Sequence, residues 1–266
     1  MKKIGVIIIG IFLLIGCNSE SESTFVEEEI EVKEAIAFNT RTVDTMIVAF
    51  PEVTDTIVGK IYYHYPVVAE TENRWLDYAI QSVLGFETQL EPKSLEEEVI
   101  REFKETYKYM DADMPSVNGY YLFDSVGIHF QNKQIIDIVR THYSYYGGAH
   151  GFHSTFSHLY DLNTKERLYW NDIFVDSVVL KKKLENQFRL DYGLTTKDEV
   201  EEILFENDFP MTDNILISED EVIIIYNVYD IAPYSSGLIS ISLKYEEIED
   251  NLTESFKSML GFNYVL

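Results

Sequence analysis

Residues 120–146, YYLFDSVGIHFQNKQIIDIVRTHYSYY, decide the fold class of this chain. Tyr120 to Phe130 and Gln134 to Tyr146 are rich in the β-branched and aromatic residues that favour strands. The polar residues 131–133 between them are typical of a hairpin turn, and Phe152 to Tyr160 resumes the strand pattern. We therefore predict an antiparallel sheet built around this stretch.

Further strands and helices are predicted on both sides of it. Strands are expected at 38–50 and 56–65, each ending at a proline, and at 215–218, 221–226 and 238–243. Apolar residues at spacings of three and four predict helices at 72–84, at 94–109, around Leu180, Leu184 and Phe188, and at 197–205. Strands interrupted by helices without regular alternation indicate an α+β fold of antiparallel β-sheets packed with helices, in two small sub-domains. The polar stretch 111–118 suggests modules at 37–113 and 114–266.

The start of the chain, MKKIGVIIIGIFLLIGC, has the pattern of a bacterial export signal. Its apolar run of about a dozen residues is shorter than the roughly 20 that cross a bilayer as a helix. Leu14 to Cys17 resembles the lipobox, in which the cysteine is acylated, and Cys17 is the only cysteine. We predict a signal peptide at 1–16 and a flexible, acidic, lipidated tether at 17–36. The protein is then an extracytoplasmic lipoprotein anchored to a membrane, the outer membrane or cell surface if the cell is Gram-negative.

The net charge of the chain excludes nucleic acid as a partner. The chain has 46 acidic and 21 basic residues, and loss of Lys2 and Lys3 with the signal would leave 21 − 2 = 19 basic residues and a charge of 19 − 46 = −27. Such a protein repels nucleic acid and attracts cationic partners. The alternative is that the acidity only keeps the protein soluble.

Two segments are candidate binding sites. The glycines around His150 allow close approach of a ligand, so the loop 147–151 could present His150 with Tyr145 and Tyr146 to a partner. Alternatively, it is a tight connection whose histidine bonds its own backbone. The second segment offers Tyr229, Asp230 and Tyr234 as a sugar or peptide platform, although a turn set by a proline explains it equally.

Metal and catalytic motifs are not found. His142, His150, His153 and His158 cluster in the sequence, but His153 and His158 lie five apart in a predicted strand, which puts them on opposite faces. We therefore expect no metal and no cofactor. The sequence has no serine nucleophile motif and no catalytic cysteine, so we expect that the protein is not an enzyme. Carboxylates such as Asp124, Asp137 and Asp230 leave a hydrolase pair open.

Three stretches together resemble a known family. THYSYYGGAHG (141–151), YDIAPYSSG (229–237) and SISLKYEEI (240–248) are similar to the RsiV/PdaC-like extracellular domain family, a domain of unknown function. The resemblance implies an envelope-facing module that binds a cell-wall-related ligand or protein, since members bind lysozyme or accompany a peptidoglycan deacetylase. The chain lacks the catalytic deacetylase motifs.

These observations predict a lipid-anchored binding protein of the cell envelope. Its expected partner is a cationic, lysozyme-like protein or a cell-wall glycan such as peptidoglycan. The alternatives are a carboxylate-dependent glycan hydrolase working near the loop 147–151, and a structural envelope lipoprotein.

Overall fold

The computed structural model describes residues 35–48, 58–69, 71–86, 92–107, 119–206 and 208–262. The predicted signal peptide, Cys17 and almost all of the predicted tether lie outside these ranges. No helix within them is both long enough and apolar enough to cross a membrane.

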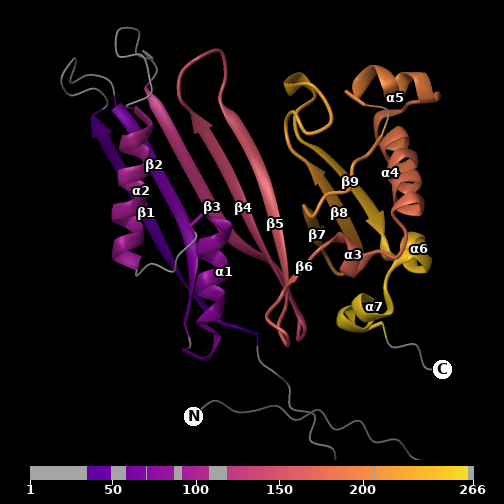
Figure 1. The fold of residues 1–266 in the computed structure, drawn as a ribbon, viewed down its shortest axis with the longest axis horizontal. Helices are drawn as coiled ribbons and strands as arrows, with labels where there is room; N and C mark the ends of the chain where they lie inside the picture. Colours follow the sequence, from indigo (N-terminus) through magenta and orange to yellow (C-terminus); the bar gives the residue numbers. More distant parts are fainter. Residues whose placement is uncertain are drawn as a thin grey trace, which may run out of the picture. The chain divides into compact units, whose positions relative to one another are not determined.

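A six-stranded sheet forms one layer of the fold, in the order β1-β2-β3-β4-β5-β6 (Figure 1). Its strands are β1 Phe38–Val48, β2 Val58–Val68, β3 Tyr120–Gln131, β4 Ile135–Tyr145, β5 Phe152–Asp161 and β6 Arg167–Leu168. The predicted hairpin is confirmed, because β3 and β4 pair antiparallel with Ile128 opposite Ile138. The α+β fold class is confirmed as well.

One strand pair departs from the predicted antiparallel arrangement. β2 and β3 are parallel, with Tyr63 beside Asp124. The connection between them contains helices α1 (Trp75–Val83) and α2 (Pro92–Tyr107). A parallel pair needs a long crossover of this kind, which returns the chain to the end of the sheet where the first strand began. The sheet is therefore mixed.

Strand β2 also continues past Pro66, where the sequence predicted its end. β3 pairs only with residues 59–64 of β2, whereas Pro66 pairs with Thr40 of β1 on the other side. A proline cannot donate to a ladder, but it is tolerated where one side of the strand has no partner. The prediction was wrong because this one-sided position is visible only in the sheet.

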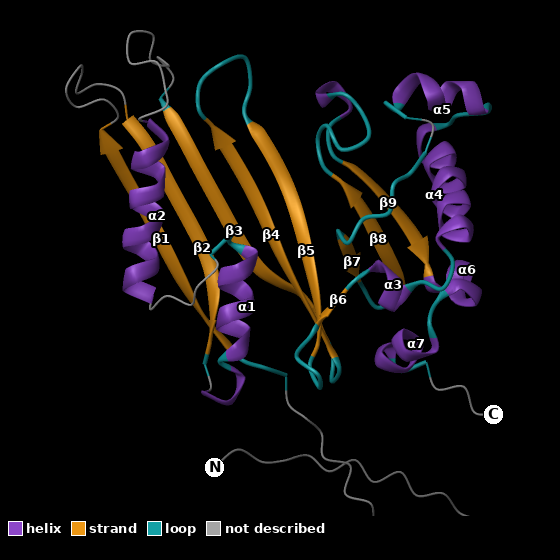
Figure 2. Cartoon of the chain, viewed as in Figure 1, coloured by secondary structure: helices purple, strands orange, loops and turns teal. Residues whose placement is uncertain are grey.

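Helices α1 and α2 cover one face of the sheet, which we call the helix-covered face (Figure 2). The apolar stripes of both helices pack with strand residues in one hydrophobic core. Its fully buried members include Leu76, Ile80, Leu95, Val99, Phe103, Ile61, Ile136 and Ile138. Alternate residues of each strand point to the opposite side, which we call the second face.

A second, three-stranded antiparallel sheet covers part of the second face. It consists of β7 Ile215–Ile217, β8 Glu221–Tyr226 and β9 Ile239–Lys244, and β7 contacts β3, β4 and β5. Around it lie α3 Trp170–Ile173, α4 Ser177–Tyr192, α5 Lys197–Ile203, α6 Tyr245–Ile248 and α7 Glu254–Leu260. The predicted stripe Leu180, Leu184 and Phe188 of α4 is fully buried, and the helix ends at Gly193 with φ +66°.

The sheet carries strands from both sides of the predicted module boundary. β2 ends before residue 113 and its neighbour β3 begins after it, while residues 111–118 lie outside the described ranges. Strand β4 contributes Ile135 to one hydrophobic core and Ile136 to the other. The division into modules 37–113 and 114–266 stays a prediction.

Two asparagine side chains cover the outer edge of β5. β6 pairs only with Leu159 and Tyr160, so the rest of this edge has no strand neighbour within the described ranges. Asn214 Oδ1 accepts from the Ser157 amide at 2.8 Å, and Asn227 Oδ1 accepts from the Thr155 amide at 2.7 Å. These amides replace the backbone groups of a missing strand.

A buried carboxyl group, Asp137, lies where β7 packs on β4. Ser157 Oγ lies 2.7 Å from Asp137 Oδ1 and 2.6 Å from the Ile215 carbonyl oxygen. A hydroxyl has one proton, so if Ser157 donates to Ile215, the Asp137 carboxyl must itself donate to Ser157 and be protonated. Burial raises the pKa of Asp137 to about 7, which agrees with this arrangement.

We expect Asp137→Asn to be tolerated and to remove a pH dependence of stability. An amide can donate to Ser157 Oγ and accept from the Ile217 amide, as the protonated acid does. Between about pH 4 and pH 7 the native state keeps a proton that the unfolded chain has released. The free energy of unfolding of the natural protein should therefore fall as pH rises through this window, by roughly 4 kcal/mol. Urea unfolding of both proteins across this range measures the difference, and identical pH profiles would show that Asp137 is already ionised.

Candidate functional site

Aromatic side chains cross the uncovered part of the second face. Tyr62 of β2 lies opposite Phe123 of β3, Phe123 opposite Tyr143 of β4, and Tyr143 opposite His153 of β5. We call these four residues the aromatic row. Cross-strand partners share a face and strands are about 4.8 Å apart, so the row spans roughly 14 Å. Phe123 is 40% and Tyr143 38% exposed, so the row is accessible to a ligand.

Ring contacts hold the row and its neighbours in place. Tyr62 stacks on Phe123 with 4.6 Å between ring centroids and 9° between planes. Beside the row, the rings of Tyr121 and Tyr145 lie 6.2 Å apart, and the Lys60 amino group lies 5.8 Å from the centre of the Tyr121 ring. A continuous exposed patch of large rings marks a binding surface more often than scattered apolar residues do.

Tyr234 extends the row beyond β5. Its ring lies 5.8 Å from that of His153, is stacked on His150 at 3.8 Å, and lies 5.7 Å from the ring of Tyr229. Its hydroxyl donates to the Gly151 carbonyl oxygen at 2.9 Å. Tyr229 has a left-handed backbone with φ +72° and is 51% exposed. The structure thus brings together three of the predicted binding residues, His150, Tyr229 and Tyr234.

The glycine loop approaches the row closely at Gly151, next to Tyr143. A Cβ atom at Gly151 would lie 2.5 Å from the Tyr143 hydroxyl oxygen, so only glycine fits there without displacing the ring. Gly147 and Gly148 adopt φ values of +93° and +91°. The glycines therefore fit both readings made from the sequence, a tight connection and a close approach to a binding surface.

The other predicted binding residues are not part of this cluster. Tyr145 lies beside the row and donates to the Gly148 carbonyl oxygen at 3.1 Å. Tyr146 instead packs on Phe103 of α2 at the helix-covered face, where burial raises its pKa to about 12. Adjacent residues at a strand end point to opposite faces, which explains why the two tyrosines are separated. Asp230 accepts from the Asn227 amide at 2.7 Å and stabilises the turn.

A buried charged cluster lies on the helix-covered face. Asp124 is fully buried and forms an ion pair with Arg140, and both of its oxygens lie 3.1 Å from His142 Nδ1. Arg140 also donates to the Val83 carbonyl oxygen at 3.1 Å, at the end of α1. Burial and the Asp124 charge raise the pKa of Tyr63. The cluster joins β2, β3, β4 and α1.

Ser154, the cross-strand partner of His142, gives the cluster the residue types of a serine hydrolase triad. However, Ser154 is only 2% exposed, and its hydroxyl has no hydrogen-bond partner among the described residues. A nucleophile must reach both its base and a substrate. The cluster therefore lacks the geometry of an accessible nucleophile.

The four histidines that cluster in the sequence lie at three separate places in the structure. His142 contacts Asp124, His150 and His153 contact Tyr234, and His158 points to the face opposite His153, as the odd spacing predicted. Within the described ranges, no group of three or more His, Cys, Asp or Glu residues is arranged to hold a metal ion.

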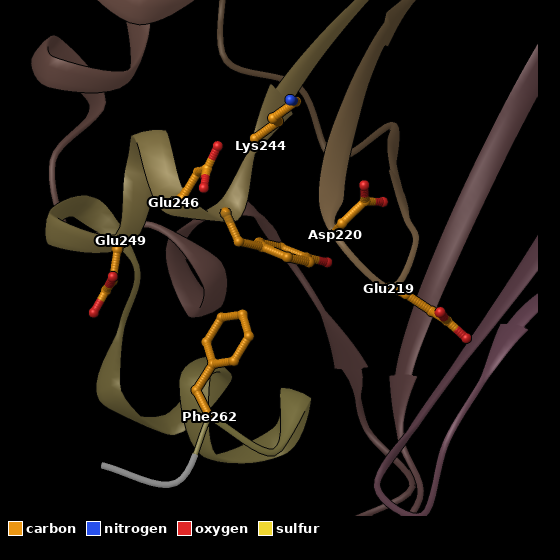
Figure 3. Close-up of a pocket in the computed structure, with 7 residues that line it drawn as sticks. Glu219, Asp220, Lys244, Glu246, Glu249 and Phe262 are labelled. Atoms are coloured by element: carbon orange, nitrogen blue, oxygen red, sulfur yellow. The ribbon is translucent and has the colours of Figure 1, made fainter.

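A cavity of about 490 Å³ lies beside the β7–β8 turn and the end of β9 (Figure 3). It is lined by carboxylates from the β7–β8 turn and from the segment after β9, together with one amino group and two rings. These residues are Glu219, Asp220, Glu246, Glu249, Lys244, Tyr245 and Phe262. Its walls carry more negative than positive charge, so they suit a cationic group better than an anion.

Two family models match the chain. The model described as Deacetylase PdaC matches residues 52–153, and that described as Protein of unknown function (DUF3298) matches residues 171–246. The first match contains the whole aromatic row, and the second contains Tyr229 and Tyr234. The resemblance predicted from sequence is confirmed to this extent, while the likeness to RsiV in particular stays a prediction.

A curated protein from Bacillus subtilis (strain 168), peptidoglycan-N-acetylmuramic acid deacetylase PdaC, is 26% identical over 171 residues. The match covers 62% of this chain and 36% of that protein, so the chain spans about a third of the relative's length. These matches contradict the prediction that the protein is not an enzyme, because they relate it, distantly, to an enzyme family. A catalytic group outside the known motifs leaves no signature in the sequence, so the absence of those motifs did not exclude an enzyme.

Two solved structures share the fold. A DUF3298 family member from Bacteroides fragilis superposes with a TM-score of 0.69 at 21% identity, over 86% of this chain and 98% of that one. A DUF3298 family protein from Pseudomonas aeruginosa superposes with a TM-score of 0.59 at 16% identity, over 82% and 95%. At these identities the likeness concerns the fold alone.

Proposed function

We propose that this protein acts in the cell envelope, where it binds glycan strands of peptidoglycan on the aromatic row. The observation that carries the proposal is the exposed row itself, which the three-stranded sheet leaves uncovered. Sugar rings have apolar faces that pack on aromatic rings, and binding sites combine such rings with a few polar groups. The distant relation to a protein named as a peptidoglycan deacetylase supports this choice of ligand.

Salt dependence distinguishes this proposal from the cationic partner that the net charge suggested. Stacking on uncharged sugar rings is hardly screened by salt, whereas attraction between exposed charges is largely screened beyond about 8 Å at physiological ionic strength. The test is co-sedimentation of the full chain with purified peptidoglycan at increasing salt, with hen lysozyme binding measured in parallel. Retention on peptidoglycan above about 150 mM salt supports the proposal. Binding to lysozyme alone, or retention lost with salt, would overturn it.

We also propose a location for the protein in the cell. We infer that Cys17 carries a lipid that anchors the protein on the outside of a membrane, because the lipobox resemblance and the single cysteine agree. Growth with a labelled palmitate should label the natural protein in a bacterial host that processes lipoproteins, and Cys17→Ser should abolish the label. Equal labelling of Cys17→Ser would exclude this anchor.

A further inference from the structure

A second cavity, of about 210 Å³, lies at the outer edge of β5, and Asp230 is the predicted binding residue that lines it. It lies along the part of β5 before Leu159, with which the two-residue strand β6 does not pair. Its walls include Phe156 and His158 of β5, Arg167 of β6, and Asp213 and Asp230 from the loops around the second sheet. The volume is below the range of about 300 to 1,000 Å³ usual for drug-sized ligands, so it suits one small unit.

Arg167 is the unusual group in this cavity. The chain has 46 acidic and 21 basic residues, yet Arg167 has no carboxylate within ion-pair distance among the described residues. Its Nε is buried and has no hydrogen-bond partner within the same ranges. The guanidinium lies 5.1 Å from the centre of the Tyr169 ring, which holds it in place. Buried donors are almost always paired, and a guanidinium is suited to bind a carboxylate through two parallel bonds.

The other polar groups suit hydroxyls. Asp213 Oδ1 accepts from the Trp170 amide at 2.9 Å, and Asp230 Oδ2 accepts from the Asn227 amide at 2.7 Å. The second oxygen of each carboxylate accepts no hydrogen bond from the described residues. It can therefore accept a hydrogen bond from a ligand hydroxyl. Burial and the nearby charge of Arg167 lower the pKa of His158 to about 4, so its ring is neutral and offers one donor and one acceptor.

These groups together select the chemistry of the ligand. A bare anion would be repelled by the two aspartates, whereas a neutral sugar would leave the guanidinium unpaired. A sugar that carries a carboxylate satisfies both, and Phe156, which is 38% exposed, can pack on its ring. Asp230 in its wall follows Tyr229, whose ring contacts Tyr234.

We propose that this cavity binds one carboxylated sugar unit, with Arg167 holding the carboxylate and Asp213 and Asp230 accepting hydroxyls. The proposal rests on the proposed glycan binding and names one kind of sugar unit that the protein recognises. Two sources share this chemistry, the lactyl ether of muramic acid where no peptide is attached to its carboxyl group, and the uronic acids, and the test separates them.

The test is a chemical-shift titration of the full chain with N-acetylmuramic acid, glucuronic acid and the neutral N-acetylglucosamine. We expect at least one acid to bind at least tenfold more tightly than the neutral sugar, and which acid does so identifies the source. Arg167→Gln should weaken binding of that acid at least tenfold and leave N-acetylglucosamine unchanged, and Arg167→Lys should restore part of the loss. Arg101→Gln, which removes an exposed arginine from α2, is the matched control and should change nothing.

Equal affinity for acid and neutral sugars, or an unchanged affinity for the acid in a folded Arg167→Gln, would overturn the assignment. Should Arg167→Gln fail to fold, Phe156→Ala tests the cavity instead, because it should weaken all bound sugars while the preference for the acid remains. Tyr143→Ala distinguishes the two proposals, since it should weaken binding of polymeric glycan and leave binding of the single acid sugar unchanged. Binding of the acid without binding of peptidoglycan would refute the proposed function and leave the cavity assigned.

Discussion

Asp124→Asn should lower the free energy of unfolding by about 3 kcal/mol. Asp124 is fully buried and is the carboxylate that pairs with Arg140, whose side chain is only 17% exposed. Removing one partner of such a pair leaves the other charge desolvated and unpaired, which typically costs about 3 to 5 kcal/mol. Arg140 and His142 would also have to share one acceptor oxygen, where the carboxylate offers them two.

Urea unfolding near pH 7.5 measures this loss. Asp137→Asn is a matched control, because it removes a second buried carboxyl from the same sheet and should not destabilise the protein at this pH. Replacing the whole pair, as in Asp124→Leu with Arg140→Met, should cost less than Asp124→Asn alone, since no charge then remains unpaired. An unfolding midpoint for Asp124→Asn equal to that of the natural protein would mean that the pair does not stabilise the fold.

Tyr143→Ala should weaken binding to peptidoglycan by roughly thirty-fold. Tyr143 is one of the two inner residues of the aromatic row, with Phe123 on one side and His153 on the other. Truncating a central aromatic side chain of a binding surface typically costs about 2 kcal/mol or more, which corresponds to this factor. Because the side chain lies on the uncovered part of the sheet, the fold should lose little stability.

The binding measurement is co-sedimentation with peptidoglycan over a range of protein concentrations. Tyr78→Ala provides the control, because Tyr78 is a similarly exposed tyrosine, 47% against 38%, on helix α1 at the opposite face of the sheet. It should bind as the natural protein does. If both variants bind equally well, peptidoglycan does not use the aromatic row.

Part of the proposed binding region could be predicted from the sequence. Glycines and a proline predict turns in the segments that contain His150, Tyr229 and Tyr234. Turns often carry binding residues. Tyr62, Phe123 and Tyr143 were missed, although each lies in a strand with aromatic residues at consecutive positions. Consecutive aromatic residues in a strand place rings on both faces of a sheet. These runs were the signal in the sequence that aromatic side chains lie on the second face.

Local patterns in the sequence determined the hairpin of β3 and β4, the buried stripe of α4 and its end at Gly193. Each depends on the backbone period of one element or on one turn, which neighbouring residues encode. Only the tertiary structure decided that β2 runs parallel to β3, that Asp124 meets Arg140, and that Arg167 has no carboxylate within ion-pair distance among the described residues. These features depend on which distant strands become neighbours and in which register. The packing of the whole chain sets that pairing, and no local period records it.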